Sequence, residues 1–216
     1  MSRIFYKGNF KYCFFSRKGG VSEKQFQSLN CSYIDEEKKN NVKTNRNIIL
    51  NKFKSKKKII IMNQVHSNKI IKITTKNPKI IDADGMISKR SDIILGILTA
   101  DCAPIVILGK SYFGIVHAGW RGALSGIIEE AFNFFKMVGE FPENLSVIIG
   151  PHIKKESFEV KNDFLNNLKK IGINQKLYIK KKNNLFFFDL SKFLFHKIKS
   201  FKIKNITISS IDTFKN

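Results

Sequence analysis

The feature that most constrains the fold is a stretch of two apolar runs, a tight turn and an amphipathic segment in the middle of the chain. Residues 104–108 and 112–117 flank a Gly109-Lys110-Ser111 turn, which predicts a β-hairpin. After Gly122, apolar residues recur at helical spacing as far as Gly139, which is a typical helix stop. The stretch therefore predicts a strand-turn-strand unit followed by the best-defined helix of the chain.

Shorter apolar runs on either side of this stretch predict further strands and helices. They do not alternate as regular βαβ units, so they favour an α+β fold with layered, mixed sheets over a doubly wound fold. We expect strands at 4–6, 11–15, 58–62, 69–74, 93–98, 145–149 and 205–209, helices at 161–170 and 189–200, a hairpin turn at 183–184, and a loop or short surface helix at 35–47. The chain has 216 residues, no internal repeat and no Pro/Ser/Gly linker, so we expect a single domain over residues 1–216.

The formal net charge of +22 raises the question of a polyanionic partner. The basic runs at 56–58 and 180–182 are short and scattered, and Lys far outnumbers Arg, which is typical of compositional drift. We therefore do not expect nucleic acid as the main partner, although the charge can steer an anionic substrate to a site.

Cysteine usage and the N-terminus indicate a compartment. Cys13, Cys31 and Cys102 are odd in number and form no CxxC pair, so we expect reduced thiols rather than disulfides. No apolar h-region of a signal peptide follows the first residues, and the longest apolar stretches are far shorter than a membrane span. We expect a cytoplasmic protein without membrane contact.

Three polar segments interrupt the apolar strands, at residues 63–66, 99–102 and 117–122. Polar groups at the ends of buried strands are costly unless they are paired or functional. If Leu108 lies opposite Tyr112, His117 faces a position near Ala103, so Cys102 and His117 lie at the same open end of the hairpin. The local pattern therefore predicts a Cys/His pair.

A Cys/His pair has two functional interpretations. One is a nucleophilic thiolate with a general base, and the other is a pair of metal ligands that need a third. His66 is the natural third candidate, but the spacing of the sequence does not place it near Cys102. His152 is a lesser candidate for a ligand, and His196 is expected to be a structural or surface residue. The alternative without function is an inert buried thiol beside hydrogen-bonded histidines.

At these residues the sequence resembles the YfiH-type laccase-domain family, whose members carry the labels multicopper polyphenol oxidase, purine nucleoside phosphorylase and peptidoglycan editing factor. The matching stretches occur in the family's order along most of the chain. They are Ser16-Arg17-Lys18-Gly19-Gly20-Val21-Ser22, Ser28-Leu29-Asn30, Asn45-Arg46, Asn63-Gln64-Val65-His66-Ser67, Asp82-Ala83-Asp84-Gly85, Thr99-Ala100-Asp101-Cys102-Ala103-Pro104, Val116-His117-Ala118-Gly119-Trp120-Arg121-Gly122 and Ile149-Gly150-Pro151-His152-Ile153.

The resemblance implies a zinc ion held by His66, Cys102 and His117, with copper as the alternative metal, and a four-layer α/β/β/α arrangement. It implies phosphorolysis of adenosine, inosine and methylthioadenosine, and deamination of adenosine, so that a purine nucleoside and phosphate are the expected small-molecule partners. Arg17 and Arg46 are anion contacts by resemblance. Family members continue past the last strand into an arginine-containing tail, so we expect the domain to lack that tail after residues 212–216.

Other residues in the motifs have two interpretations each. Arg121 and the start of the helix after Gly122 suit an anion, although Arg121 is equally suited to a surface salt bridge. Asp101 is either a partner of a histidine ligand or the cap of a turn. Asp82 and Asp84 suit either base or ribose contacts or turn chemistry, and Trp120 suits core packing better than purine stacking.

Two rival functions stay open from the sequence. Cys102 and His117 as catalytic groups without metal suit a hydrolase or amidase that edits a peptidoglycan precursor, and copper-dependent phenol oxidation is the older label of the family. A single Cys/His/His set with an open position suits zinc and provides no multicopper cluster. A basic binding module is the alternative that is not an enzyme.

Overall fold

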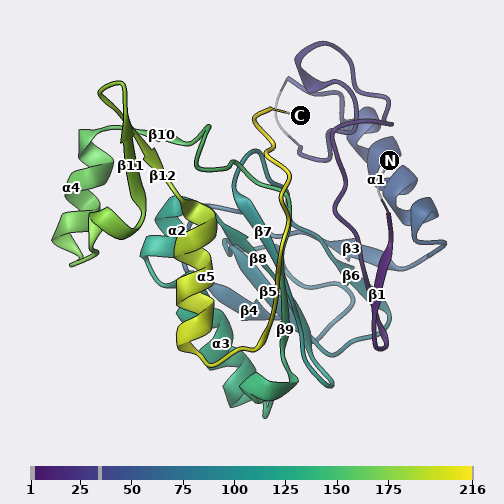
Figure 1. Cartoon of the computed structure of the whole chain (residues 1–216). Coiled ribbons are helices and arrows are strands. Elements are labelled where there is room, and N and C mark those ends of the chain that lie inside the picture. The colour runs from purple at the N-terminus through teal and green to yellow at the C-terminus, as the bar shows by residue number, and fades with distance from the viewer. Residues whose placement is uncertain (1–2, 34–35, 216) are drawn as a thin grey trace.

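A six-stranded mixed sheet forms the centre of the structure, a computed structural model that describes residues 3–33 and 36–215 (Figure 1). Its strands lie in the order β13 (Asn205–Ile208), β9 (Ser146–Ile149), β7 (Ala103–Leu108), β8 (Phe113–Ala118), β5 (Gly85–Ser88) and β4 (Ile70–Lys72). The predicted hairpin is the antiparallel pair β7–β8, whereas β13 runs parallel to β9 and β4 runs parallel to β5. The two central strands of the sheet therefore come from the stretch that constrains the fold most.

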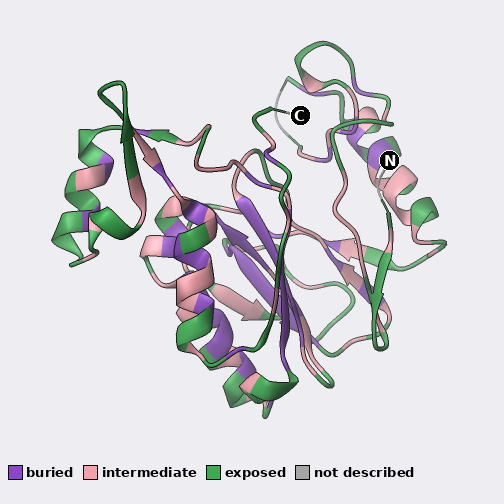
Figure 2. Cartoon of the chain, in the orientation of Figure 1, coloured by how far each residue is buried: buried purple, intermediate pink, exposed green. Residues whose placement is uncertain are grey.

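Strand β7 is buried along its whole length because the sheet is covered on both faces. Successive side chains of a strand point to opposite faces, so Ile105 and Ile107 join one apolar cluster while Val106 and Leu108 join another. The sequence is accordingly a continuous apolar run without polar alternation. Figure 2 shows the central strands in the colour of buried residues.

Helices α3 (Ile127–Met137) and α5 (Leu190–Ser200) cover one face of the central sheet (Figure 1). Helix α3 buries side chains at helical spacing, so its apolar stripe faces the sheet, whereas Glu130 and Lys136 are exposed and Glu129 pairs with Lys197 of α5. The core on this side contains, among others, Ile105, Ile107, Val116, Ile127, Phe135, Phe193 and Leu194.

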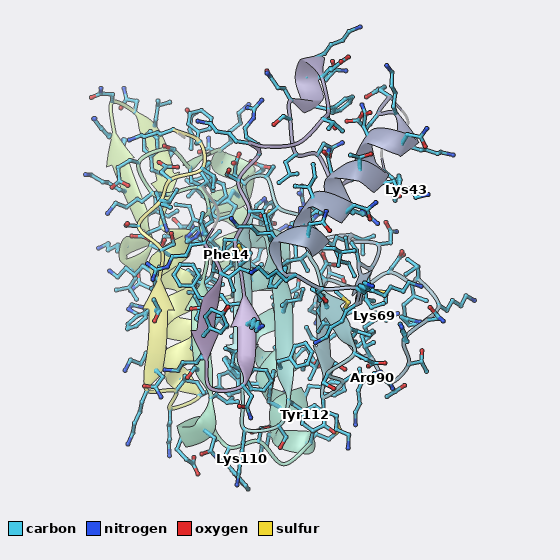
Figure 3. All side chains as sticks on the ribbon, turned by 90° about the vertical axis from the view of Figure 1, so that its right-hand side faces the viewer. Phe14, Lys43, Lys69, Arg90, Lys110 and Tyr112 are labelled. Carbon is cyan, nitrogen blue, oxygen red and sulfur yellow. The ribbon has the colours of Figure 1, made fainter. Side chains whose placement is uncertain are left out.

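A second β layer covers the opposite face of the sheet. It consists of the antiparallel hairpin β1 (Phe5–Lys7) and β2 (Phe10–Tyr12) and the parallel pair β3 (Lys58–Ile60) and β6 (Ile93–Leu95). Phe10 and Tyr12 in β2, and Phe14 just after it, pack on the central strands. In Figure 3, Phe14 lies toward the end of the central strands that is far from Lys110 and Tyr112 at the β7–β8 turn. Helix α1 (Lys39–Lys52) lies beyond this layer (Figure 1). The expected α+β class with layered mixed sheets is confirmed.

A smaller lobe is inserted between β9 and β13. It contains α4 (Asn162–Lys170) and a three-stranded antiparallel sheet in the order β10 (Glu159–Val160), β12 (Leu185–Phe188) and β11 (Ile179–Lys182). The remaining short elements are α2 (Trp120–Leu124), η1 (Lys24–Phe26), η2 (Pro142–Asn144) and η3 (Gln175–Leu177). None of the helices within residues 3–33 and 36–215 combines the length and apolar character that a bilayer crossing requires.

The structure corrects one expectation about helices and decides between the two alternatives of another. The helix expected from Gly122 to Gly139 is divided into α2 and α3, because Gly126 adopts a left-handed conformation with φ of 92°. The segment 35–47, expected as a loop or short surface helix, belongs mostly to the 14-residue helix α1; its first residue, Asp35, lies outside the described residues. The apolar pattern of α1 is too weak to give its length, because only Val42 and Asn45 are buried on it.

Candidate metal centre

The candidate site lies at the open end of the β7–β8 hairpin. In the observed register Pro104 pairs with His117 and Ala103 pairs with Ala118, so the position opposite His117 is one residue from the expected Ala103. Cys102 immediately precedes β7. The hairpin therefore brings Cys102 and His117 to the same end of the sheet, as the local pattern predicts.

Three side chains meet at this point: His66, Cys102 and His117. One ligand atom from each lies within 4.8 Å of the others. Cys102 Sγ is 3.7 Å from His66 Nε2, and the two imidazole rings are 4.8 Å apart in an edge-to-face arrangement. His66 is exposed, Cys102 is half-buried and His117 is buried, so the cluster is open to solvent at His66.

Asp84 lies beneath this cluster and determines how two of its members are held. Its side chain is 0 % exposed, and its Oδ1 is 2.9 Å from His117 Nδ1. A carboxylate only accepts hydrogen bonds, so His117 Nδ1 carries the proton and Nε2 presents its lone pair to the cluster. The same carboxylate accepts hydrogen bonds from the backbone N–H groups of Val65, His66 and Ser67 and from the Ser67 hydroxyl.

These contacts give Asp84 a role that differs from both sequence interpretations. It is neither exposed for a ribose contact nor a simple turn residue, because it ties the loop of His66 to the ring of His117. The loop adopts an unusual backbone, with His66 at a φ of 61°. The hydrogen bonds to Asp84 are the interactions that hold this conformation in place.

Electrostatics in the cluster differ from those at an exposed site. Burial lowers the pKa of His117, and the neighbouring His66 lowers it further, against the opposing hydrogen bond with Asp84. Burial also opposes the ionisation of Asp84, but hydrogen bonds from His117 and Ser67 outweigh it and hold the pKa below its usual range. Burial, with Asp101 and Asp84 nearby, raises the pKa of the Cys102 thiol to about 11. Without a cation the thiol is protonated at neutral pH.

Gly119 follows β8 and passes against the cluster. A β-carbon at this position would lie 2.8 Å from Cys102 Sγ and 2.8 Å from His66 Cδ2. Contacts this short are not tolerated between such atoms, so the glycine is required by the close approach of the chain to the two side chains.

A cavity of about 220 Å³ opens beside the cluster. His66, Cys102, Asp101 and Arg121 contribute polar groups to its wall, while the apolar part of the wall is formed by Trp120, Ile153, Phe158 and Leu190. A concave site with a few converging polar groups on an apolar wall suits a small planar ligand. Ile153 belongs to one of the family-like stretches, but the sequence did not single out Ile153, Phe158 or Leu190 as site residues, because nothing in their local pattern separates a cavity wall from the core.

Trp120 and Arg121 lie at the start of α2. The Arg121 guanidinium lies 4.4 Å from the centre of the Trp120 ring, and the same ring meets Phe164 edge-to-face at 5.1 Å. Trp120 thus packs against the smaller lobe and lines the cavity at the same time. Helix α2 is only five residues long, so an anion in the cavity would rely on Arg121 more than on the dipole of the helix.

The other predicted residues lie in different surroundings. Arg17 donates a hydrogen bond to the carbonyl of Gln27, and Arg46 binds the carbonyl of Cys31 and lies over the ring of Tyr33. Neither arginine is in the wall of the cavity beside Cys102. Their role in substrate binding stays a prediction.

The remaining acidic and histidine candidates lie outside the cluster. Asp82 is exposed and accepts a hydrogen bond from Asn63 Nδ2, whereas Asp101 lines the cavity. His152 is buried between the Gly150 carbonyl and the Ser191 hydroxyl, at 2.7 Å from each. His196 is within 3.0 Å of the Tyr178 hydroxyl.

Comparison with known proteins places this architecture in a family. The sequence model of the family described as multi-copper polyphenol oxidoreductase laccase matches residues 11–216. The chain belongs to this laccase family. It is 32 % identical over 203 residues to a purine nucleoside phosphorylase of Rickettsia prowazekii, an alignment that covers 91 % of the chain and 83 % of the relative. The purine nucleoside phosphorylase of Aquifex aeolicus is 31 % identical over 164 residues, covering 76 % of the chain and 75 % of the relative.

Solved structures of similar proteins share the fold of this laccase-family chain. The hypothetical protein YfiH of Bacillus licheniformis superposes with a TM-score of 0.86 at 23 % identity, covering 94 % of the chain and 82 % of that protein. YlmD from Geobacillus stearothermophilus superposes with a TM-score of 0.82 at 23 % identity, covering 91 % and 79 %. The expected YfiH-like arrangement of layers is therefore confirmed.

Proposed function

We propose that this laccase-family protein is a zinc-dependent purine nucleoside phosphorylase whose metal is held by His66, Cys102 and His117. The observation that carries the proposal is the convergence of these three side chains within 4.8 Å, beside a cavity with an apolar wall. The relatives from Rickettsia prowazekii and Aquifex aeolicus bear the name purine nucleoside phosphorylase and support the choice of substrate.

The donor set of the cluster fits zinc. Two imidazole nitrogens and one thiolate are preferred zinc ligands, and three protein ligands leave a position open, as in catalytic zinc sites. The Asp84–His117 contact is the carboxylate–histidine arrangement that orients metal-binding imidazoles. A bound cation would stabilise the Cys102 thiolate that burial disfavours. When bound, zinc supplies Lewis-acid polarisation at the open end of the cluster.

The residues around the cavity suit the proposed phosphorolysis of a nucleoside. In this reaction an oxygen of phosphate bonds to C1′ of the ribose, the bond from C1′ to the purine nitrogen breaks, and a proton is taken up by the leaving purine. Arg121 provides a fixed positive charge for phosphate at the cavity wall. Asp101 provides an acceptor for a hydroxyl or amino group of the nucleoside. The apolar wall of Trp120 and Phe158 suits the flat purine.

Substrates within this class are proposed as adenosine, inosine and methylthioadenosine. Deamination of adenosine at C6 is the second reaction that we propose for the same cavity. Both reactions require the nucleoside to reach the metal cluster. Replacing any one of the three metal-binding side chains is therefore expected to lower the rates of phosphorolysis and deamination together.

The rival functions are less well supported by the geometry. A metal-free Cys102/His117 hydrolase requires a thiolate of low pKa beside its base, whereas the pKa of Cys102 is raised and its contact is with His66 Nε2. A multicopper oxidase requires several metal ligand sets. Within residues 3–33 and 36–215, one group of His, Cys, Asp or Glu side chains converges in this way.

The proposal is tested by metal analysis and phosphorolysis on protein purified without chelator or added metal. We expect about one zinc per chain and phosphate-dependent release of the base from adenosine and inosine. Both should be lost in Cys102→Ala and His117→Ala. His196→Ala, a histidine replacement outside the cavity, is the matched control and should retain both.

Two results would contradict the proposal. One is a folded protein without metal that still releases adenine from adenosine and hypoxanthine from inosine after Cys102 has been alkylated. The other is copper bound in place of zinc together with oxidation of a phenol, which would restore the oxidase interpretation.

A further inference from the structure

The segment that follows β9 carries two residues of the cavity wall, Ile153 and Phe158, on either side of a tight turn. Within the turn the backbone N–H groups of Ser157 and Phe158 both donate to the carbonyl of Lys154, at 2.9 Å each. The backbone N–H of Ile153 donates to the carbonyl of Asp101, at 3.0 Å. The position of this turn therefore determines where Ile153 and Phe158 lie in the wall of the cavity relative to Cys102.

Asp212, near the C-terminus, binds across both ends of this turn. Its Oδ1 accepts a hydrogen bond of 3.2 Å from the backbone N–H of Lys154, and its Oδ2 accepts one of 2.6 Å from the hydroxyl of Ser157. The side chain is only 9 % exposed, so these bonds are shielded from solvent. One carboxylate thus joins the first and the last residue of the turn.

The C-terminal segment is in turn fixed to the same region by other contacts. Lys154 Nζ donates a hydrogen bond of 2.6 Å to the carbonyl of Ser209, and the backbone N–H of Ser209 donates one of 2.8 Å to the carbonyl of Ile149. Residues 209–212 therefore lie along the segment 149–157 and hold the Asp212 carboxylate at the turn.

We propose that Asp212 is a positioning residue of the cavity, which holds the 154–157 turn so that Ile153 and Phe158 form the wall against which the nucleoside binds. The inference rests on the proposed function for its ligand, but the ordering of the turn by Asp212 is independent of it. Asp212 does not line the cavity, so it acts through the two wall residues.

The test compares Asp212→Ala with Glu156→Gln, which removes an exposed carboxylate from the same turn. In Asp212→Ala we expect KM for inosine to rise by about 10- to 100-fold, since a misplacement of about 1 Å by a distant mutation can cost about 100-fold. We expect kcat and zinc content to stay within about twofold of wild type, because the proposed role of Asp212 is to place the wall residues and not the metal ligands. Glu156→Gln should leave KM unchanged. Ser157→Ala removes one of the two bonds, so it serves as the milder variant if Asp212→Ala does not fold.

Hydrogen exchange provides the readout that does not depend on substrate. Amides of residues 153–158 should exchange faster in Asp212→Ala than in wild type, while those of α3 keep their protection. Unchanged exchange in 153–158 overturns the positioning role, and so does an unchanged KM despite faster exchange. If the wild type cleaves no nucleoside, the proposed function fails and the exchange result alone decides whether Asp212 orders the turn.

Discussion

Replacing Asp84 by Asn tests the central contact of the metal centre. The carboxylate accepts four bonds from the loop of residues 65–67 and faces the Nδ1–H of His117. An amide has one oxygen and one NH₂ group, so it cannot satisfy donors on both sides. If its oxygen faces Ser67, its NH₂ faces His117 and favours the tautomer with the proton on Nε2, which is unable to bind a metal.

The expected magnitude follows from this conflict. Changes to groups that orient a metal-binding histidine cost about 10- to 100-fold in metal affinity, which corresponds to about 1.4–2.7 kcal/mol. The metal-free protein should also lose about 1–3 kcal/mol of stability, because at least one buried donor is left without its acceptor. The alternative orientation of the amide places its NH₂ against backbone N–H groups and leads to the same loss.

The assay is competition for zinc against a chromophoric chelator, together with urea unfolding of the metal-free protein. Asp82→Asn is the matched control, because Asp82 is exposed and bonds to Asn63 outside the cluster. The pKa of Asp84 is depressed in the folded state, so its stabilising effect is present above its ordinary pKa and disappears as pH falls through the lower folded value. The stability gap to Asp84→Asn should therefore narrow below about pH 4. Zinc affinity within twofold of wild type would refute the proposed role.

Three further predictions concern other parts of the structure. Gly119→Ala introduces a β-carbon 2.8 Å from both Cys102 Sγ and His66 Cδ2, so zinc affinity should fall by at least about tenfold; an unaltered affinity contradicts the close approach. Glu140→Gln replaces a buried carboxylate that accepts hydrogen bonds from three backbone N–H groups of the β7–β8 turn. These hydrogen bonds hold the pKa of Glu140 below its usual range against the opposing effect of burial. Urea unfolding should therefore show a loss of about 2 kcal/mol of stability at pH 7, and this loss should shrink below about pH 4. Phe135→Ala leaves a cavity at a fully buried position between α3 and the sheet, and should cost about 3–5 kcal/mol in the same assay without lowering zinc content of the folded protein.

Local pattern was sufficient for the parts of the fold that depend on neighbouring residues. The β7–β8 hairpin was predicted to within one residue of its observed register. The prediction came this close because a short turn leaves little freedom in the pairing of the strands that it joins. The apolar spacing of α3 was also predicted correctly, but the break at Gly126 was not, since a glycine inside a helical pattern is compatible with either outcome.

Helix α1 shows where the hydrophobic pattern is too weak to predict an element. Its most buried polar residue, Asn45, accepts a hydrogen bond from the N–H of Val21 and donates to Ser22 Oγ and to the carbonyls of Ser28 and Asn30. The helix is therefore held by polar contacts with a distant loop, and pattern analysis depends on apolar periodicity.

The sequence by itself determined that Cys102 and His117 lie together, because one hairpin carries both residues and hairpin geometry is local. Only the tertiary structure decided that His66 completes the group and that Asp84 lies beneath it, since these residues lie 18 to 51 positions away from Cys102 and His117 in the chain. The tertiary structure likewise brought Ile153, Phe158 and Asp212 to the cavity region. Contacts of this range depend on how the layers pack, and the local period of a sequence carries no information about that packing.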